Sequence, residues 1–246
     1  MKCHVLGSGS QRNGYVLTNG EETLIIEVGC KLLEVKKVLN YNMSSIVGAL
    51  LTHSHNDHAG YIDSYMKAGI TILASEETLV EKKVTKMRYM TKSVVPGKGY
   101  KLGNFKLIPF SLTHDVPCLG YLIEHPSIGL AAFITDTAEC DYIFPPLNHI
   151  FIETNFSEDI MERNIVEGRL SPAMRPRLKR SHLEIESTKE ILRAQDLSKV
   201  MNILLIHLSA GNSDQARFIA EVSAVTGKPV IAAEKGVTVN FNLNPY

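Results

Sequence analysis

The chain has 246 residues, of which 44% are hydrophobic and 21% are charged. These values are ordinary for a globular protein with a substantial core, and they exclude a disordered chain. The 26 basic and 26 acidic side chains give a net charge of zero. No global field therefore indicates a nucleic-acid partner, although local basic patches can still bind phosphates.

The four cysteines are Cys3, Cys30, Cys118 and Cys140, and no two of them form a C-x-x-C pair. A disulfide framework is not expected in a chain of this length, and reduced cysteines fit a cytosolic protein. The sequence has no signal-peptide pattern and no apolar stretch of membrane-spanning length. We therefore expect a cytoplasmic protein without a membrane partner.

The first half of the chain predicts strands and helices in alternation. Short apolar runs separated by Gly, Asn and Ser predict strands at 2–6, 14–18, 22–28, 46–52 and 70–73. Apolar residues at helical spacing predict helices over 31–40 and 58–67. Ser75 is the expected N-cap of the next helix.

The second half repeats this composition. We predict strands at 105–110, 119–124, 128–135, 149–153, 202–206, 229–232 and 236–241, and helices over 157–167, 184–194 and 213–225. No low-complexity linker divides the chain. The sequence therefore predicts one α/β domain over residues 1–246, with two mixed sheets packed face to face and helices outside.

One short segment is dense in metal-binding side chains. His53, His55, Asp57 and His58 lie within six residues, after a predicted buried strand. In an extended segment, His53, His55 and Asp57 would share one parity, and His58 would point elsewhere. The segment can therefore serve two adjacent ions, with His53 and His55 on one and Asp57 and His58 on the other.

Three further polar residues each follow a predicted apolar strand, where α/β proteins usually build their sites. They are His114, Asp136 and His207. Any one of them alone could be a hydrogen-bonded surface residue. The remaining histidines lack such company, and we assign no site role to His4, His125 and His149.

The motif His53-x-His55-x-Asp57-His58, followed by His114, Asp136 and His207, resembles the signature of the metallo-β-lactamase superfamily. The resemblance covers essentially the whole chain. The opening Leu6-Gly7-Ser8-Gly9-Ser10, with Asn13 shortly after, is similar to the first loop of the phosphodiesterase branches. The fold that this resemblance implies is a four-layer αββα sandwich.

The resemblance also implies a ligand set. His53, His55 and His114 would hold one ion, Asp57, His58 and His207 the second, and Asp136 would bridge them. Imidazole and carboxylate ligands suit zinc, with manganese or iron as alternatives. The lactam-cleaving members commonly use a cysteine ligand, and no cysteine stands at a ligand position here.

Two ions about 3.5–4 Å apart can share a hydroxide that attacks a phosphodiester. We expect His182, Glu153 and Asp57 to be catalytic. His182 is similar to a histidine that acts near the leaving group in tRNase Z and in the 5′-exonucleases of this fold. Glu153 resembles the acidic residue that orients it. Alternatively, Ser181 and Glu184 form a helix capping box, which could also fix the loop that carries His182.

Two basic stretches favour a polyanionic substrate. The first contains Lys82, Lys83, Lys86, Arg88, Lys92, Lys98 and Lys101, and could instead be a solvated helix face. The second contains Arg163, Arg169, Arg175, Arg177, Lys179 and Arg180. Pro172 and Pro176 predict that it is a loop near the site. Tyr89, Tyr100 and Phe156 could stack on bases.

We expect a dinuclear metal-dependent phosphodiesterase, most similar in action to the bacterial 5′-exonucleases of this fold, acting on DNA or RNA. The expected substrate-binding residues are Ser8, Ser10, Asn13, Asn155, Arg175, Arg177, Lys179 and Arg180. The alternatives are a small-molecule cyclic phosphodiesterase and a lactone or thioester hydrolase. Between His58 and His114 the chain lacks the long Gly/Pro-rich arm of tRNase Z. A homodimer is compatible with the sequence.

Overall fold

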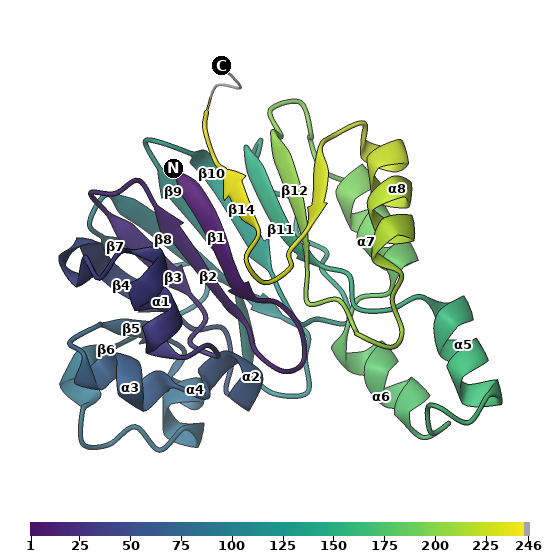
Figure 1. Ribbon diagram of the computed structural model, residues 1–246, viewed down its shortest axis with the longest axis horizontal. Coiled ribbons are helices and arrows are strands. Elements are labelled where there is room, and N and C mark those ends of the chain that lie inside the picture. Colours follow the sequence, from purple (N-terminus) through teal and green to yellow (C-terminus); the bar gives the residue numbers. More distant parts are fainter. Residues whose placement is uncertain (244–246) are drawn as a thin grey trace.

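Two β-sheets packed face to face, with helices on their outer faces, form the protein (Figure 1). The computed structural model describes residues 1–243. The predicted four-layer αββα sandwich is confirmed. In that part of the chain, no helix is both long and apolar enough to cross a membrane.

Each sheet is mixed. The first contains β1 (Lys2–Gly7), β2 (Gly14–Thr18), β3 (Thr23–Ile26), β4 (Ile46–Leu50), β5 (Ile72–Ala74), β6 (Thr91–Ser93) and β14 (Thr238–Asn240). The second contains β7 (Tyr100–Leu102), β8 (Phe105–Leu112), β9 (Cys118–His125), β10 (Gly129–Ile134), β11 (His149–Glu153), β12 (Asn202–Ile206) and β13 (Val230–Ala232). Their strand orders are β14-β1-β2-β3-β4-β5-β6 and β13-β12-β11-β10-β9-β8-β7.

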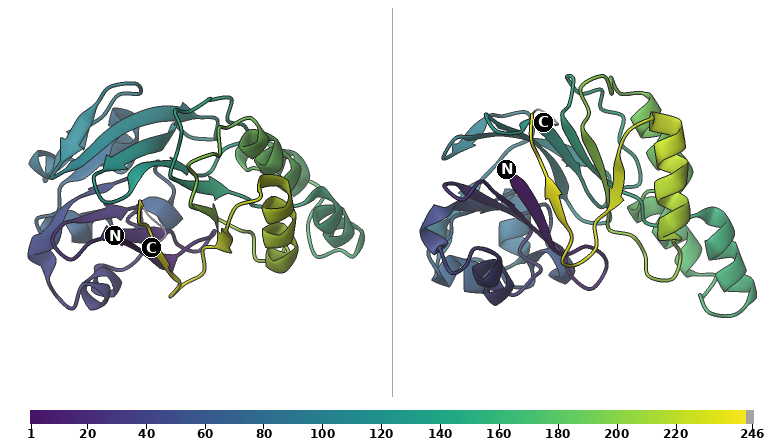
Figure 2. Two further views of the ribbon diagram at one scale, coloured as in Figure 1. Left: turned by 90° about the horizontal axis from the view of Figure 1, so that it is seen from above. Right: turned by 45° about the horizontal axis from the view of Figure 1, so that its top comes forward.

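Helices cover both outer faces. Beside the first sheet are α1 (Leu32–Val38), α2 (Asn56–Ala59), α3 (Ile62–Lys67) and α4 (Glu76–Glu81). The second half supplies α5 (Glu158–Val166), α6 (Met174–Ser181), α7 (Ile185–Arg193) and α8 (Gln215–Thr226). Short 3-10 turns lie at Met43–Ser45 and Arg88–Met90. Helices α7 and α8 pack on the second sheet, whereas α5 and α6 extend away from the sandwich (Figures 1 and 2).

The period-two alternation of strand side chains divides the apolar residues among three layers. In β10, Ala131 and Phe133 face the core between the sheets, whereas Ala132 and Ile134 face the core under α7 and α8. A third core lies between the first sheet and helices α1, α3 and α4. Central strands are therefore buried on both faces, which explains their continuous apolar sequences.

The parallel strands place their carboxyl ends at one edge of the sandwich. In the first sheet, β3 is parallel to β4, and in the second, β10, β11 and β12 are parallel. Residues that follow these strands therefore gather at that edge, as expected for an α/β site.

Several predicted elements differ from the structure. The predicted helix over 58–67 is two short helices, α2 and α3. The short lysine-containing strands β6 and β7 were not predicted, because they lack an apolar run.

The second basic stretch is only partly a loop. Residues 167–173, with Arg169 and Pro172, connect α5 to α6, but α6 spans Met174–Ser181 and carries Arg175, Arg177, Lys179 and Arg180. Pro176 is in the first turn of α6, where a missing N–H breaks no helical hydrogen bond.

The predicted capping box of Ser181 and Glu184 is wrong. Ser181 ends α6, and Glu184 itself is the N-cap of α7, accepting a hydrogen bond from the backbone N of Glu186 at 2.6 Å. The predicted N-cap at Ser75 is confirmed, since its Oγ accepts a hydrogen bond from Thr78 N.

Phe133 anchors the core between the sheets. Its ring lies 5.5 Å from that of Tyr15 and 5.4 Å from that of Phe151, measured between centroids, and all three rings are buried. We expect Phe133→Ala to lower the free energy of unfolding by about 3–5 kcal/mol, measured by denaturant titration. The exposed Val166→Ala should change it by less than about 0.5 kcal/mol. Equal effects of the two substitutions would contradict this assignment of the core.

Candidate metal centre

The loop after β4 and helix α2 carry four of the expected ligands. His53 lies in the loop, and His55 is the N-cap residue of α2. Asp57 and His58 lie in the single turn of α2. The expected extended parity of Asp57 is therefore wrong, because a helical turn separates Asp57 and His58 from His53 and His55.

Close backbone packing fixes the position of α2. Asn13 N donates to the carbonyl O of Asp57 at 2.7 Å, and Val28 N donates to that of His58 at 2.8 Å. A Cβ on Gly29 would lie 1.6 Å from the carbonyl O of Asp57. Only glycine fits at this close approach. The β3–α1 connection therefore sets where Asp57 and His58 stand.

The structure brings the three other expected ligands to the same edge. His114 follows β8, Asp136 follows β10 and His207 follows β12. His207 has a φ of 55°, which is uncommon for a residue with a side chain. Ser8 helps to hold it there, since its Oγ accepts a hydrogen bond from His207 N at 2.8 Å.

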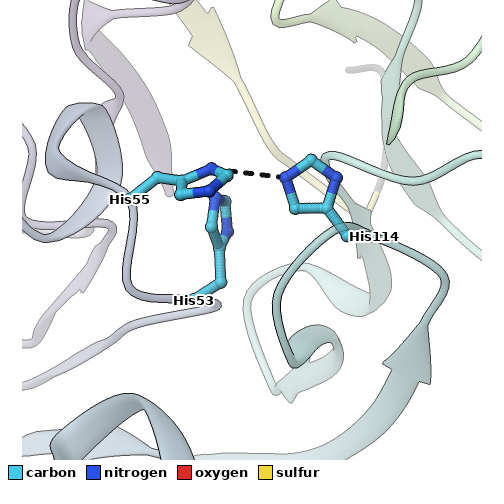
Figure 3. A group of neighbouring side chains, drawn as sticks. All are labelled: His53, His55 and His114. Atoms are coloured by element: carbon cyan, nitrogen blue, oxygen red, sulfur yellow. Dashed lines mark hydrogen bonds between the residues drawn. The ribbon is translucent and has the colours of Figure 1, made fainter. Parts of the chain in front are cut away.

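The imidazoles of His53, His55 and His114 form a first ligand group and point toward one another (Figure 3). His55 Nδ1 lies 3.3 Å from His114 Nε2. His53 Nε2 is buried and has no hydrogen-bond partner among residues 1–243. A buried polar atom without a partner costs free energy, and a bound cation is the partner that these nitrogens fit.

Asp57, His58 and His207 form a second ligand group, and Asp136 lies between the two groups. Asp57 Oδ2 lies 3.2 Å from His58 Nε2 and 3.3 Å from His207 Nε2. Asp136 Oδ1 lies 3.3 Å from His58 Nε2, and its Oδ2 lies 4.0 Å from His114 Nε2. Nitrogen and oxygen donors in this arrangement suit first-row divalent ions.

Each ligand histidine also contacts a partner through its other ring nitrogen, which fixes the ring and raises its basicity toward a metal. The contacts are His53 Nδ1 with Thr52 Oγ1 at 2.9 Å, His55 Nε2 with Asp115 Oδ1 at 3.3 Å, His58 Nδ1 with Glu27 Oε1 at 3.2 Å, His114 Nδ1 with Ser181 O at 2.7 Å and His207 Nδ1 with Glu153 Oε1 at 3.1 Å. Three of these contacts, those of His53, His114 and His207, have hydrogen-bond geometry, and the ring orientation that they fix is a second observation that fits these residues to bound metal.

Glu27, Thr52 and Asp115 were missed by the sequence interpretation. Glu27 is fully buried, and its Oε1 accepts a hydrogen bond from Thr52 Oγ1 at 2.5 Å. It therefore orients His53 through Thr52, and its charge lies 3.2 Å from His58 Nδ1, which makes no hydrogen bond within residues 1–243. The signal was present, because Glu27 follows the apolar strand β3 as Asp136 follows β10.

Carboxylates dominate the electrostatics of the centre. Burial alone would lower the pKa of His207, but Asp136, Asp57 and Glu153 together raise it to about 10. Burial would raise the pKa of Asp136, yet the nearby His207 and His58 hold it well below its usual range. The field that favours these imidazolium groups also attracts divalent cations.

His182 and Glu153 lie beside both ligand groups. Glu153 is fully buried at the end of β11, and its Oε1 lies 2.6 Å from His182 Nδ1. The rings of His182 and His207 stack with 5.4 Å between centroids. No residue in the described part of the chain engages His182 Nε2. Burial lowers the pKa of His182, but the charge and hydrogen bond of Glu153 outweigh burial and raise it.

Three of the residues expected to bind substrate support the ligands instead of facing open solvent. Ser8 holds the backbone of His207, and Asn13 Nδ2 lies 3.1 Å from Asp57 Oδ2. Asn155 Nδ2 donates to the carbonyl O of His207 at 2.9 Å. Ser10 is exposed near them. Direct contact of any of these residues with substrate stays a prediction.

The cations of α6 divide into two sets. Arg175 and Lys179 form ion pairs with Glu158 of α5, the second at 3.0 Å. Arg177 lies 3.9 Å from Asp115 Oδ2, and Arg180 has no ion pair among residues 1–243. Both arginines line a hollow of about 470 Å³ that also borders His114.

The aromatic residues that were predicted to stack on bases differ in exposure. Phe156 is buried, with 1% of its surface exposed, so its predicted stacking on bases is wrong. Tyr89 is 80% exposed.

We expect Asp136→Ala to lower the metal content of the purified protein by about one ion per chain, measured by elemental analysis, because the ligand between the two groups is lost. Asp141→Ala is the matched control, since Asp141 is an exposed acid in the following loop. Unchanged metal stoichiometry in Asp136→Ala would remove Asp136 from the ligand set.

Glu27→Gln should weaken metal binding by roughly 10- to 100-fold, measured by competition with a chelating dye, because the amide orients His58 and Thr52 less strongly. Glu22→Gln is the control, as Glu22 also contacts a histidine, His125, at 3.2 Å. Equal affinities of Glu27→Gln and wild type would show that Glu27 does not support the ligands.

Comparisons with known proteins agree with this fold. The protein of Bacillus subtilis called YhfI, a metallo-beta-lactamase fold protein, is similar in structure with a TM-score of 0.75 and 18% identity, covering 97% of this chain and 99% of its own. A diphosphatase of the PhnP family has a TM-score of 0.67 and 16% identity, covering 97% and 96%. The short form of human tRNase Z has a TM-score of 0.65 and 12% identity, covering 98% and 99%.

At these identities, the likenesses show the fold alone. No curated protein matches the chain by sequence. The family described as the metallo-beta-lactamase superfamily matches residues 7–144, which is more than half of the chain. The predicted resemblance is thereby confirmed, and the protein belongs to the metallo-β-lactamase superfamily, as a hydrolase with a centre suited to divalent metal.

Proposed function

We propose that the protein is a dinuclear metal-dependent phosphodiesterase that acts on nucleic acid as a nuclease, with an exonuclease-like action. The observation that carries this proposal is the position of His182. Its Nδ1 is held by Glu153, its ring lies against a ligand of the second group, and its Nε2 is free among the described residues. A group so placed can deliver a proton beside the metal centre.

Zinc, manganese or iron ions held by the two ligand groups would supply Lewis acidity and a nucleophilic water at neutral pH. The chain itself supplies the ligand geometry and the proton. Hydrolysis forms a bond from phosphorus to the water oxygen and breaks the bond to the leaving oxygen. The leaving oxygen then takes the proton from His182 Nε2, while the carboxylate of Glu153 stabilises the imidazolium that gives it up.

Two other activities use the same fold. A small-molecule cyclic phosphodiesterase would need the same proton from His182, so only its substrate distinguishes it. A lactone or thioester hydrolase would not depend on His182 in the same way. The diphosphatase and the tRNase among the similar structures are compatible with phosphate chemistry on this scaffold. The exposed cations Arg177 and Arg180, which line the hollow beside His114, favour the nuclease.

His182→Ala should reduce hydrolysis of a thymidine dinucleotide by roughly 10²–10⁴-fold, because its alkoxide leaving group needs a proton. Bis-p-nitrophenyl phosphate should lose much less activity, because p-nitrophenolate leaves without one. Metal content should stay at the wild-type value. His4→Ala, at a histidine on β1 outside the ligand groups, is the control for both substrates.

Equal losses on the two substrates would contradict proton delivery by His182. If metal-loaded protein cleaves a lactone but no phosphodiester, the proposed function is wrong. Activity confined to cyclic phosphodiesters would select the small-molecule alternative over the nuclease.

A further inference from the structure

A lysine strip lies along one side of the molecule. We use this name for Lys82, Lys83, Lys86, Arg88, Lys92, Lys98 and Lys101, which lie in a segment without a single acidic residue. The segment runs from the end of α4 through β6 to β7. These are the edge strands of the two sheets, so the strip crosses the side where both sheets end.

The charges of the strip are largely unneutralised. Arg88 forms an ion pair with Glu76. Within residues 1–243, no carboxylate lies within 4.0 Å of any of the six lysine amines. Lys92 and Lys98 instead lie over the ring of Tyr100, at 5.3 and 6.0 Å from its centroid. The α6 residues Arg175 and Lys179, in contrast, are paired with acids of α5.

One end of the strip lies against α2, the helix that carries Asp57 and His58. Lys82 Nζ donates to Asn56 Oδ1 at 2.9 Å, and Asn56 directly precedes the ligand Asp57 in α2. From there the chain continues from the end of α4 to β6 and β7, the edge strands of the two sheets (Figure 1). A polyanion lying on it would therefore have one of its phosphates close to the ligand groups.

Protection of sheet edges explains only part of this pattern. Lysines on edge strands prevent edge-to-edge association, and Lys92 of β6 and Lys101 of β7 fit that role. Lys83 and Lys86 lie before β6, outside any strand, and both are exposed. An exposed aromatic ring, Tyr89, stands among these cations with 80% of its surface in solvent. Cations with an exposed aromatic are the combination that binds unpaired nucleotides.

We propose that the lysine strip binds the backbone of a single-stranded nucleic acid whose scissile phosphate lies at the metal centre. The inference rests on the proposed function and names its substrate class. Tyr89 would stack on a base, which a duplex would not offer. The ligands His53, His58 and Asp136 are recessed, with at most 2% of their surfaces exposed, and a flexible single strand reaches them more easily than a stiff duplex.

The test compares two matched variants that leave the ligands untouched. Lys86→Gln/Lys98→Gln removes two charges from the strip. Lys199→Gln/Lys228→Gln removes two charges that lie shortly before the parallel strands β12 and β13. His207 follows the other end of β12, so these lysines lie away from the metal centre. Binding of metal-loaded protein to a fluorescent, nuclease-resistant phosphorothioate oligothymidylate is measured by anisotropy at several salt concentrations. Turnover of bis-p-nitrophenyl phosphate is measured in parallel.

The strip variant should bind about 10- to 100-fold more weakly at low salt, and its slope of log affinity against log salt should fall by about 1.4, for two lost single-strand phosphate contacts. The control should bind as wild type, and both should turn over the small diester normally. Tyr89→Ala should weaken binding without changing the slope.

Wild-type affinity and slope in the strip variant would overturn the inference while leaving the proposed function intact, if the small diester is still hydrolysed. Tighter binding of a duplex than of the single strand would also overturn it. Conversely, the protein could bind the oligonucleotide through the strip and hydrolyse no phosphodiester. That result would contradict the proposed function but not the inference that the strip binds single-stranded nucleic acid.

Discussion

The structure depends on the convergence of buried carboxylates and imidazoles at one edge of the sandwich. Glu27, Asp136 and Glu153 are almost fully buried there. Burying charge without compensation costs several kcal/mol for each group, so these acids require cationic partners. The imidazoles provide part of that compensation, and bound divalent ions would provide the rest. The apolar layers must therefore be rigid enough to hold the groups together before an ion binds.

The sheets provide this rigidity because the same strands carry core and site. In β10, Phe133 packs between the sheets, and Asp136 follows only three residues later. In β12, Leu204 and Ile206 are in the same core, directly before His207. Displacement of either strand would move a ligand with it. The geometry of the centre is thus a direct consequence of the packing between the two sheets.

The fold could be predicted, and the residues that the structure brings together at the candidate metal centre could be selected, because both depend on strong local patterns. Apolar runs identified the central strands, and polar residues directly after those strands identified His114, Asp136 and His207. Glu27 and Asp115 were missed, although Glu27 also follows an apolar strand, because no local pattern shows that their carboxylates reach His58 and His55 in another segment. Helix α6 was missed because Pro176 suggests a loop until its place in the first helical turn is known. The ion pairs of Arg175 and Lys179 with Glu158 depend on α5 and α6 lying side by side, which no local pattern reveals.

One carboxylate oxygen connects the two halves of the chemistry. Glu153 Oε1 lies 2.6 Å from His182 Nδ1 and 3.1 Å from His207 Nδ1, so the proposed proton donor and a candidate ligand share one support. A substitution at position 153 would change both at once and could not adjust either alone. Such a substitution would therefore disturb the metal centre whenever it altered His182. Tyr89 and the exposed lysines lie apart from this support, so they can be substituted without altering it.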